Sequence, residues 1–452
     1  MQFRQACASL PLSMEGGDDR PLIVAGITNP QTCVVLKERL LALREAGFRV
    51  VLISSPGGLV GRIAAEAGIE VVAIPIRREI APLHDLRSLW RLLSALHRLR
   101  PQITEFSTPK AGLLGSLAAK LCGVPMRVYL LRGLRLETLH GFKRHVLLAA
   151  ERIASACCHH VVCNSESLRA KALALRVAAE RKLRLIGPGS SHGVDVERFY
   201  PGQDEVRAHL GIPHHVPVIG FVGRLTRDKG VPELIEAFEE VLGSVPAARL
   251  LLLGCFDESE DAITEELRAR IEMDPRIVRT GFVDDTAKYY RAMDMMVLPT
   301  WREGFPNVVL EAAASGIPVI TTLSTGSRDA VVPEVTGLLI PAGYPEAITE
   351  AVLRLVRNPD VRHRMGRAAR AWVIERFVNG YVLGLTASFY KGLLERPARI
   401  PWRRWLRTRL ETDFRGGLFG LRNLQSVGSG FSGVQGPAGY DAEPERRAHG
   451  EQ

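Results

Sequence analysis

Short, continuously apolar runs alternate with helix-length segments along most of this chain, and no other feature limits its fold more. In the first half, such runs lie at 22–25, 49–54, 71–74 and 126–131. A strand that is apolar without alternation is typical of a parallel sheet covered on both faces. Strands that alternate with helices predict a doubly wound α/β sheet.

The alternation breaks near 199–202 and restarts at 218–222, which predicts a second domain of the same kind. Its further strands are expected at 250–253, 277–280, 295–298, 318–321 and 337–340, followed by helices near 345–357, 361–376 and 380–394. Two such domains would face a central cleft, and open α/β sheets bind ligands beyond the carboxyl ends of their strands. The predicted divisions are a disordered leader (1–20), a first Rossmann-like domain (21–200), a second (213–378), a closing helix (379–395), a basic amphipathic segment (396–415) and a disordered tail (416–452).

Charge and cysteine usage limit the partners and the compartment. The formal net charge of +10 over 452 residues favours anionic partners, such as a phosphate ligand, a membrane surface or nucleic acid. Seven scattered Cys favour a reducing compartment over a disulfide scaffold. No apolar run approaches the roughly 20 residues that span a bilayer, and residues 1–20 lack the apolar core of a secretory signal. We therefore expect a cytoplasmic protein.

The segment 396–410 is strongly basic, with six Arg and no acidic residue. Trp402, Trp405 and Leu406 recur at helical spacing, and Pro401 is well placed to begin a helix. One interpretation is a helix that lies on an anionic membrane, on the inner face of the cytoplasmic membrane. The other is a helix packed on the body of the protein with solvated Arg side chains.

The segment 300–311 contains the strongest chemical signal. A strand leads into a loop with Glu303, Gly304, Phe305, Pro306 and Asn307, and Asn307 is expected to cap the helix that begins at Val308. Backbone N–H groups at a helix start form a natural phosphate site. Glu311 lies one residue beyond the capping-box position, so a cap does not explain it. Its two oxygens suit the neighbouring hydroxyls of a ribose, and Glu303 could meet those of a second sugar.

The segment 221–230 contains the second signal. Gly223, Arg224 and Lys229 follow the first strand of the second domain and precede a helix. Arg224 and Lys229 can converge on a diphosphate, the first as a planar fork and the second as a point charge. They would neutralise the charge that develops on a departing nucleotide diphosphate.

Together these segments resemble the retaining family 4 glycosyltransferases of the GT-B fold, whose hallmark is two Glu separated by seven residues, as in Glu303 and Glu311. The likeness extends from about 22 to 394. It implies that Glu311 binds the nucleotide ribose, Glu303 the transferred sugar, and Arg224 and Lys229 the diphosphate. Gly304, Phe305, Pro306, Asn307 and Val308 would present the helix start to the donor. It also implies an acceptor-side first domain, a donor-side second domain, no cofactor and no required metal.

The segments 108–115, 193–195 and 325–329 resemble a branch that acts in bacterial surface or exopolysaccharide assembly. Members of that branch extend a polyprenyl-diphosphate-linked sugar, so the resemblance implies a nucleotide-sugar donor, with a UDP-sugar as the first expectation, and a saccharide or lipid-linked saccharide acceptor. Arg132 stands where many relatives have His, and we include it as a candidate catalytic residue. Thr104-Glu105 replaces a His-containing segment, and 28–30 lacks the usual paired glycines.

Several alternatives stay open at this stage. Cys157, Cys158, His159, His160 and Cys163 do not have a standard zinc spacing. Glu303 and Glu311 could be a hydrolase pair, but that leaves Arg224 and Lys229 unexplained. Only net charge supports nucleic-acid binding, and we expect none. A non-catalytic nucleotide-sugar-binding partner of another transferase is the remaining alternative.

Overall fold

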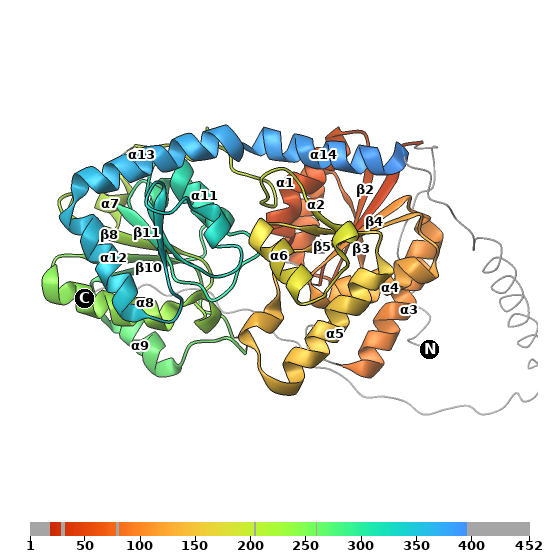
Figure 1. Cartoon of the computed structure of the whole chain (residues 1–452), viewed down its shortest axis with the longest axis horizontal. Helices are drawn as coiled ribbons and strands as arrows, with labels where there is room; N and C mark the ends of the chain where they lie inside the picture. The colour runs from red at the N-terminus through yellow and green to blue at the C-terminus, as the bar shows by residue number, and fades with distance from the viewer. Residues whose placement is uncertain (1–18, 29–31, 78–80, 203–204, 259, 396–452) are drawn as a thin grey trace, which may run out of the picture. The chain divides into compact units, whose positions relative to one another are not determined.

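The computed structural model describes residues 19–28, 32–77, 81–202, 205–258 and 260–395 (Figure 1). Its first half comprises β1 (Leu22–Gly26), α1 (Thr32–Glu45), β2 (Arg49–Ser54), α2 (Gly58–Ala67), β3 (Glu70–Ala73), α3 (Pro82–Leu99), β4 (Ile103–Ser107), α4 (Pro109–Leu121), β5 (Met126–Leu131), α5 (Gly141–Cys157), β6 (His160–Cys163), α6 (Glu166–Ala174) and β7 (Leu183–Leu185). The remainder comprises α7 (Val206–His209), β8 (Val218–Val222), α8 (Val231–Ser244), β9 (Arg249–Leu253), α9 (Glu265–Met273), β10 (Ile277–Gly281), α10 (Ala287–Tyr290), β11 (Met295–Leu298), α11 (Asn307–Ala314), β12 (Val319–Thr322), β13 (Gly337–Ile340), α12 (Pro345–Arg357), α13 (Pro359–Arg376) and α14 (Asn379–Glu395).

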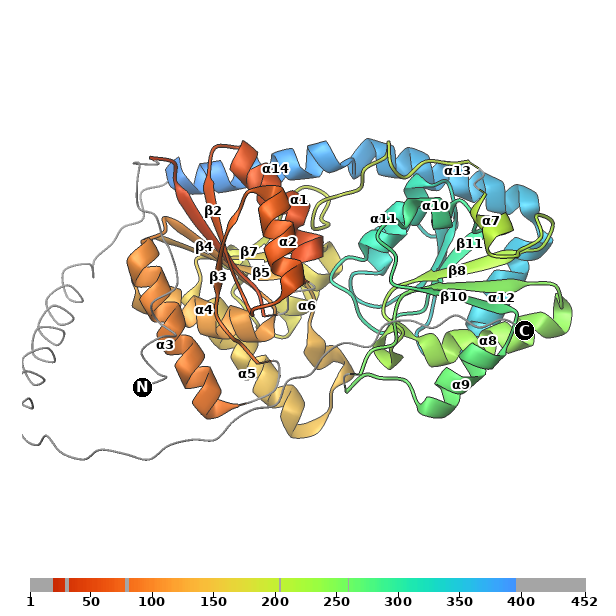
Figure 2. The ribbon, with the colours of Figure 1, turned by 180° about the vertical axis from the view of Figure 1, so that it is seen from behind.

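Two parallel sheets organise these elements, and Figures 1 and 2 show them from opposite sides. Within the described residues, the first sheet has seven strands in the order β3-β2-β1-β4-β5-β6-β7. The second has six strands in the order β10-β9-β8-β11-β12-β13. The strand order reverses between β1 and β4 in the first sheet and between β8 and β11 in the second. The prediction of two doubly wound α/β sheets is confirmed.

Helices cover both faces of the first sheet, which explains why its strands are continuously apolar. Ile23 and Ala25 pack in a cluster with α1, α2 and α14, whereas Leu22 and Val24 pack in a second cluster with α3 and α4. Because side chains alternate along a strand, every residue of β1 is buried. In the second domain, α8 packs against α12, and α11 against α13.

The strands β4 and β7 were not among the predicted ones. β4 has the sequence Ile-Thr-Glu-Phe-Ser, which lacks the continuous apolar pattern, yet all five of its residues are buried. Glu105 is accommodated because Arg39 of α1 donates to it, with Nη2 at 2.8 Å from Oε2. A partner that lies 66 residues away cannot be read from local pattern. β7 has only three residues, too few for a pattern.

The last helix, α14, returns to the first sheet. Tyr390 and Leu393 belong to the same hydrophobic cluster as β1, β2 and α1. The hydroxyl of Tyr390 donates to Glu105 and also lies 3.2 Å from Arg39 Nη2. The helix predicted at 379–395 is therefore part of the first domain's core, although it follows the second domain in the chain.

Some predictions lie outside the described residues. They are the basic segment 396–415, the tail 416–452 and nearly all of the leader 1–20. Within the described part of the chain, no helix has the length and apolar character that a bilayer crossing requires.

Candidate active site

The two predicted binding segments lie at the switch point of the second sheet. Residues 223–230 follow β8 and residues 299–306 follow β11, and these are the adjacent strands at which the order reverses. Gly230 has φ +74, and a side chain there would collide with the carbonyl oxygen of Pro299. Gly223 has φ +154, which also favours glycine. The close approach of the two loops thus depends on glycine, and ligands bind at such a point in open α/β sheets.

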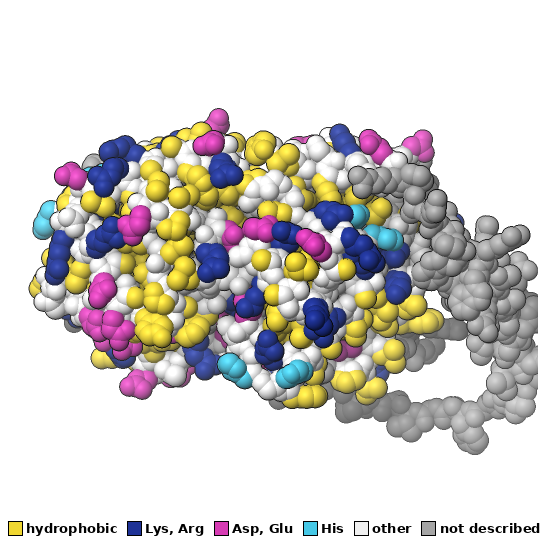
Figure 3. All heavy atoms as spheres, in the orientation of Figure 1, with side chains coloured by type: hydrophobic (Ala, Val, Ile, Leu, Met, Phe, Trp, Pro, Cys, Tyr) yellow, Lys and Arg dark blue, Asp and Glu magenta, His cyan; other side chains and the backbone are white. Residues whose placement is uncertain are grey.

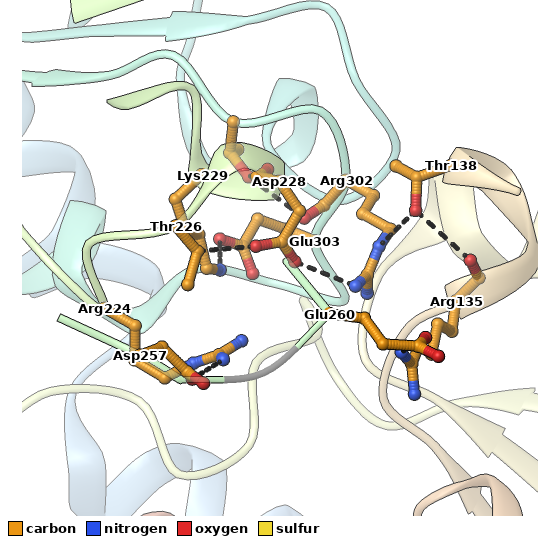
Figure 4. Close-up of polar contacts among 11 residues, drawn as sticks. Arg135, Thr138, Arg224, Thr226, Asp228, Lys229, Asp257, Glu260, Arg302 and Glu303 are labelled. Carbon is orange, nitrogen blue, oxygen red and sulfur yellow. Dashed lines mark hydrogen bonds and ion pairs between the residues drawn. The ribbon is translucent and has the colours of Figure 1, made fainter. Parts of the chain in front are cut away.

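Asp228 fastens the two loops together, although the sequence did not suggest this role (Figure 4). Its carboxylate accepts from Thr226 Oγ1 at 2.6 Å and from Arg302 Nη2 at 2.8 Å. Its carbonyl accepts from the backbone of Trp301 at 3.0 Å. Burial favours the neutral acid, but the Thr226 hydrogen bond and the Arg302 charge hold the pKa of Asp228 below its usual value. An ionised Asp228 therefore fixes the position of the residues beside it.

Lys229 and Glu303 are the residues directly after Asp228 and Arg302, and they form an ion pair. Both side chains are largely buried, with 18% of Lys229 and 15% of Glu303 exposed. Glu303 is held in addition by its backbone N–H, which donates to Thr325 at 3.0 Å. A cation and an anion therefore sit in contact at the switch point, each of which could bind a complementary group of a substrate.

Arg224 has a separate partner. Its guanidinium pairs with Asp257, on the segment that follows β9, and 42% of the side chain is exposed. The structure thus places Arg224 and Lys229 on one loop but gives each its own carboxylate. The predicted convergence of the two cations on a diphosphate stays a prediction.

The start of α11 differs from expectation in one respect. Asn307 was predicted to cap the helix, but the cap position is Pro306, and no side chain caps there. The side chain of Asn307 instead accepts from Ser190 Oγ at 3.0 Å, and its Nδ2 lies 2.8 Å from His192 Nε2. Because its side chain is held by residues that follow the first sheet, Asn307 is not available for its own helix.

The residues around this helix start fill different roles. Phe305 is buried, and its ring packs 5.4 Å from that of Phe377. Gly304 lies against the carbonyl of Arg132, where a side chain could not fit. Val308 contributes its carbonyl, which lies 3.3 Å from the hydroxyl of Tyr290. The backbone around Gly304 and Pro306 is therefore closely confined by both halves of the chain.

Glu311 lies one turn along α11, and Tyr290 Oη donates to its Oε2 at 2.8 Å. Burial raises the pKa of Glu311 above its usual range, although the Tyr290 hydrogen bond and the charge of Arg198 oppose this shift. Nothing in the helix cap accounts for this carboxylate, as predicted. The structure adds that keeping Glu311 ionised is costly, which is common for groups retained for binding.

Arg132 follows β5 of the first sheet and faces the loop of Glu303. Its Nε is buried and has no hydrogen-bond partner among the described residues. Burial and the neighbouring charge of Arg39 lower the pKa of Arg132 to about 10, against the opposing charges of Glu105 and Glu303. Arg132 is thus a poorly compensated cation beside the predicted sugar carboxylate.

Further contacts join loops of the first sheet to the site. Arg302 Nε donates to Thr138 at 3.1 Å, and Thr325 Oγ1 donates to Glu137 at 2.7 Å. The hydroxyl of Ser167 donates to Asp329, and Gly326 N donates back to Ser167 at 2.8 Å. The loops of both sheets therefore hold the segment that contains Glu303 and Thr325.

Sequence reasoning missed Asp228, Arg302, Tyr290 and His192. Asp228 and Arg302 had a detectable signal, because each directly precedes a predicted site residue of opposite charge. Tyr290 and His192 had none, since they reach the site from distant parts of the chain. The Cys and His of 157–163 take structural roles: His159 Nδ1 accepts from the backbone of Arg127 at 3.1 Å, and Cys158 Sγ lies 3.2 Å from Ser116 Oγ. In the described residues, no three His, Cys, Asp or Glu side chains group as a metal site would require.

Comparison with solved structures defines the class of fold. HepE from Anabaena in complex with UDP-glucose aligns with a TM-score of 0.70 at 18% identity, over 82% of this chain and 99% of HepE. Sucrose-phosphate synthase from Thermosynechococcus elongatus aligns with a TM-score of 0.69 at 21% identity, over 83% of this chain and all of that one (100%). The architecture is therefore the GT-B fold of glycosyltransferases.

Comparison by sequence defines the family. Residues 34–189 match the glycosyl transferase 4-like domain, and residues 216–358 match the glycosyl transferases group 1. The capsular polysaccharide biosynthesis glycosyltransferase CapM of Staphylococcus aureus is 34% identical over 82% of this chain and 96% of its own length. A GDP-mannose-dependent alpha-mannosyltransferase of Mycobacterium tuberculosis is 32% identical over 74% of this chain and 85% of its own. The chain belongs to the group 1 glycosyl transferases, and it is a glycosyltransferase.

Proposed function

We propose that this enzyme transfers a sugar from a nucleotide-diphosphate sugar, with retention at the anomeric carbon, to a saccharide or a polyprenyl-diphosphate-linked saccharide during cell-surface polysaccharide assembly. The observation that carries the proposal is the Lys229–Glu303 pair at the switch point of the second sheet. Lys229 supplies a positive charge for a diphosphate, and Glu303 supplies acceptor oxygens for sugar hydroxyls.

In this proposal the donor enters between the loops after β8 and β11. When the diphosphate arrives, Lys229 exchanges part of its interaction with Glu303 for phosphate oxygens, and Arg224 does the same with respect to Asp257. The two carboxylates hold the cations in place beforehand, so little reorganisation is needed. Glu311 accepts from ribose hydroxyls, because one of its oxygens already has Tyr290 as donor. No metal or other cofactor is assigned a step.

The printed names of relatives support the donor and acceptor classes. HepE was solved with UDP-glucose, and an Escherichia coli relative, 26% identical over 67% of this chain, is a UDP-Gal:alpha-D-GlcNAc-diphosphoundecaprenol alpha-1,3-galactosyltransferase. CapM acts in capsular polysaccharide biosynthesis. UDP-sugars with a polyprenyl-diphosphate-linked saccharide are therefore the first substrates to test, and GDP-mannose is the first alternative donor.

The test is a matrix of donors and acceptors with product analysis. UDP-, GDP- and dTDP-sugars are each incubated with short-chain lipid-linked and free saccharides, and the product linkage is read by NMR. We expect one nucleotide class to give transfer with the anomeric configuration of the donor. Inversion would overturn the retaining assignment. Donor binding by calorimetry without transfer to any acceptor would favour a non-catalytic binding partner instead.

A further inference from the structure

The helices on one side of the first sheet expose large apolar side chains. In α3, Leu83, Leu86 and Trp90 are 75%, 64% and 65% exposed. These residues are three and four positions apart, so they form one stripe, on a different side of the helix from the buried Leu92 and Leu96. A soluble helix normally presents charged or polar residues on its outer face.

The neighbouring helices continue this surface. α4 packs against both α3 and α5, and Figure 1 shows the three side by side. Leu121, at the end of α4, is 42% exposed, and on α5 Phe142 and Ile153 are 83% and 48% exposed. Contiguous exposed apolar area of this kind marks an interaction site more often than chance placement.

The charges on the same helices are mostly positive. α3 carries three Arg and one Asp, α4 two Lys, and α5 one Lys, two Arg and one Glu. Both acidic residues are engaged: Asp85 pairs with Lys110 at 2.8 Å, and Glu151 accepts from Tyr129 at 2.7 Å. Figure 3 shows dark blue side chains among yellow ones in the region where Figure 1 places α3 and α5.

We propose that the outer face of α3, α4 and α5 is a membrane-docking surface that lies on an anionic lipid bilayer. Leu86, Trp90 and Phe142 would enter the headgroup region, while Arg87 and Arg91, one position further along the helix, would meet lipid phosphates. Trp suits this depth, because its ring is apolar and its N–H is polar. Charge complementarity selects an anionic bilayer over a second copy of this chain, since two basic faces would repel each other.

This inference rests on the proposed lipid-linked acceptor but can fail separately from it. A bilayer beneath the first domain would place a membrane-embedded acceptor near the loop of Arg132, while the donor arrives from water at the second domain. It differs from the basic segment 396–410, which remains a separate prediction. The experiment must therefore locate the contact at α3 in the full-length protein.

The decisive comparison uses two double variants. Leu86→Ser/Trp90→Ser removes two apolar side chains of the surface, and Met273→Ser/Phe282→Ser removes two equally exposed ones (81% and 68%) from the second domain. Co-flotation with phosphatidylcholine vesicles, with and without phosphatidylglycerol, measures binding. We expect the first variant to bind anionic vesicles roughly tenfold more weakly, which corresponds to about 1.4 kcal/mol, and the second to match wild type. Equal binding by all three proteins would overturn the proposal.

Two further measurements remove the remaining ambiguities. Quenching of emission by acyl-brominated lipids should fall in Trp90→Phe, whatever Trp402 and Trp405 contribute; unchanged quenching contradicts contact at α3. Arg87→Glu/Arg91→Glu should lose the preference for anionic vesicles. If wild type sediments as a dimer that Leu86→Ser/Trp90→Ser dissociates, a second copy covers the face and the proposal is wrong. Transfer to a short-chain, water-soluble acceptor should be equal in wild type and Leu86→Ser/Trp90→Ser. Absence of transfer in both would count against the proposed function and not against docking.

Discussion

The two domains share a strand order but differ in the charge of their helices and in how their site residues are paired. The first sheet has basic and apolar helices, α3 to α5, whereas α8 carries four Glu and no Lys or Arg. In the second domain the site cations are already paired, Lys229 with Glu303 and Arg224 with Asp257. The first domain contributes Arg132, whose Nε has no partner among the described residues.

This difference indicates a division of labour. Paired charges keep their geometry without ligand, which suits a site that must bind the same diphosphate in every cycle. An uncompensated buried cation is costly, and its presence makes sense where an anionic or strongly polar group arrives with the substrate. Variants that separate these two situations test the comparison directly.

The largest effect is expected from Glu303→Ala. We expect kcat to fall roughly 100- to 1,000-fold, the range seen when one preorganised polar group is removed from a reacting centre, while nucleotide binding changes little. Steady-state transfer kinetics and calorimetry with the nucleotide alone measure the two quantities. Glu260→Ala is the control, because this exposed carboxylate only pairs with Arg135, at 3.1 Å. A Glu303→Ala enzyme with wild-type kcat would falsify the site assignment.

Lys229→Ala is expected to act mainly on donor binding. Loss of a charged hydrogen bond costs about 1.5–3 kcal/mol, which corresponds to a roughly 10- to 150-fold weaker affinity. Donor titration followed by calorimetry tests this expectation. Lys288→Ala serves as a control, since Lys288 lies over the ring of Tyr289 on α10. If Lys229→Ala bound donor as wild type does, the pairing in the second domain would be structural only.

Arg132→Leu sharpens the contrast between the halves. Removing a buried donor without a partner should raise the free energy of unfolding by about 1–3 kcal/mol, while transfer falls. Arg127, on the same strand, is the matched control because its Nε and Nη1 donate to backbone carbonyls at 2.7 and 2.6 Å. Arg127→Leu should therefore destabilise the protein and leave transfer by the folded fraction unchanged. Destabilisation by Arg132→Leu would show that this residue has a structural partner.

Glu311→Gln should exchange function for stability. The pKa of Glu311 is raised in the folded protein, so folded Glu311 retains its proton to higher pH than unfolded Glu311 does. Its contribution to stability is therefore full below the unfolded pKa and is lost as pH rises through the folded pKa. The amide removes this loss, so we expect a higher Tm at neutral pH and roughly tenfold weaker donor binding. A lower Tm would contradict the assigned cost of ionisation.

Glu151→Gln is expected to leave transfer unchanged and to alter only the pH dependence of stability. Burial raises the pKa of Glu151 from 4.5 to about 7, against the hydrogen bond from Tyr129. Wild-type stability should then decline between pH 4.5 and 7, while that of the variant should not. Denaturant unfolding across this pH range measures the slope. Equal slopes would show that Glu151 titrates normally.

The sequence predicted the parts of the fold that depend on local pattern. The apolar strands of the second domain and the last three helices lie within a few residues of their predicted positions, because each core there is formed by neighbouring segments. β4 was missed, since burial of Glu105 depends on Arg39. The predicted cap at Asn307 was wrong, because His192 and Ser190 hold that side chain. Lys229 and Glu303 were both named, but their direct contact follows from Asp228 and Arg302, whose pairing spans 74 residues.

The return of α14 to the first sheet has a consequence for synthesis on the ribosome. The strands of the first domain emerge early, yet Tyr390 and Leu393, which complete one face of that domain, emerge after the whole second domain. Until then, Arg39 and Glu105 lack the hydroxyl of Tyr390, and an apolar surface stays uncovered. Nascent chains usually fold one domain after another from the N-terminus. In this enzyme the first domain to be made is the last to be finished.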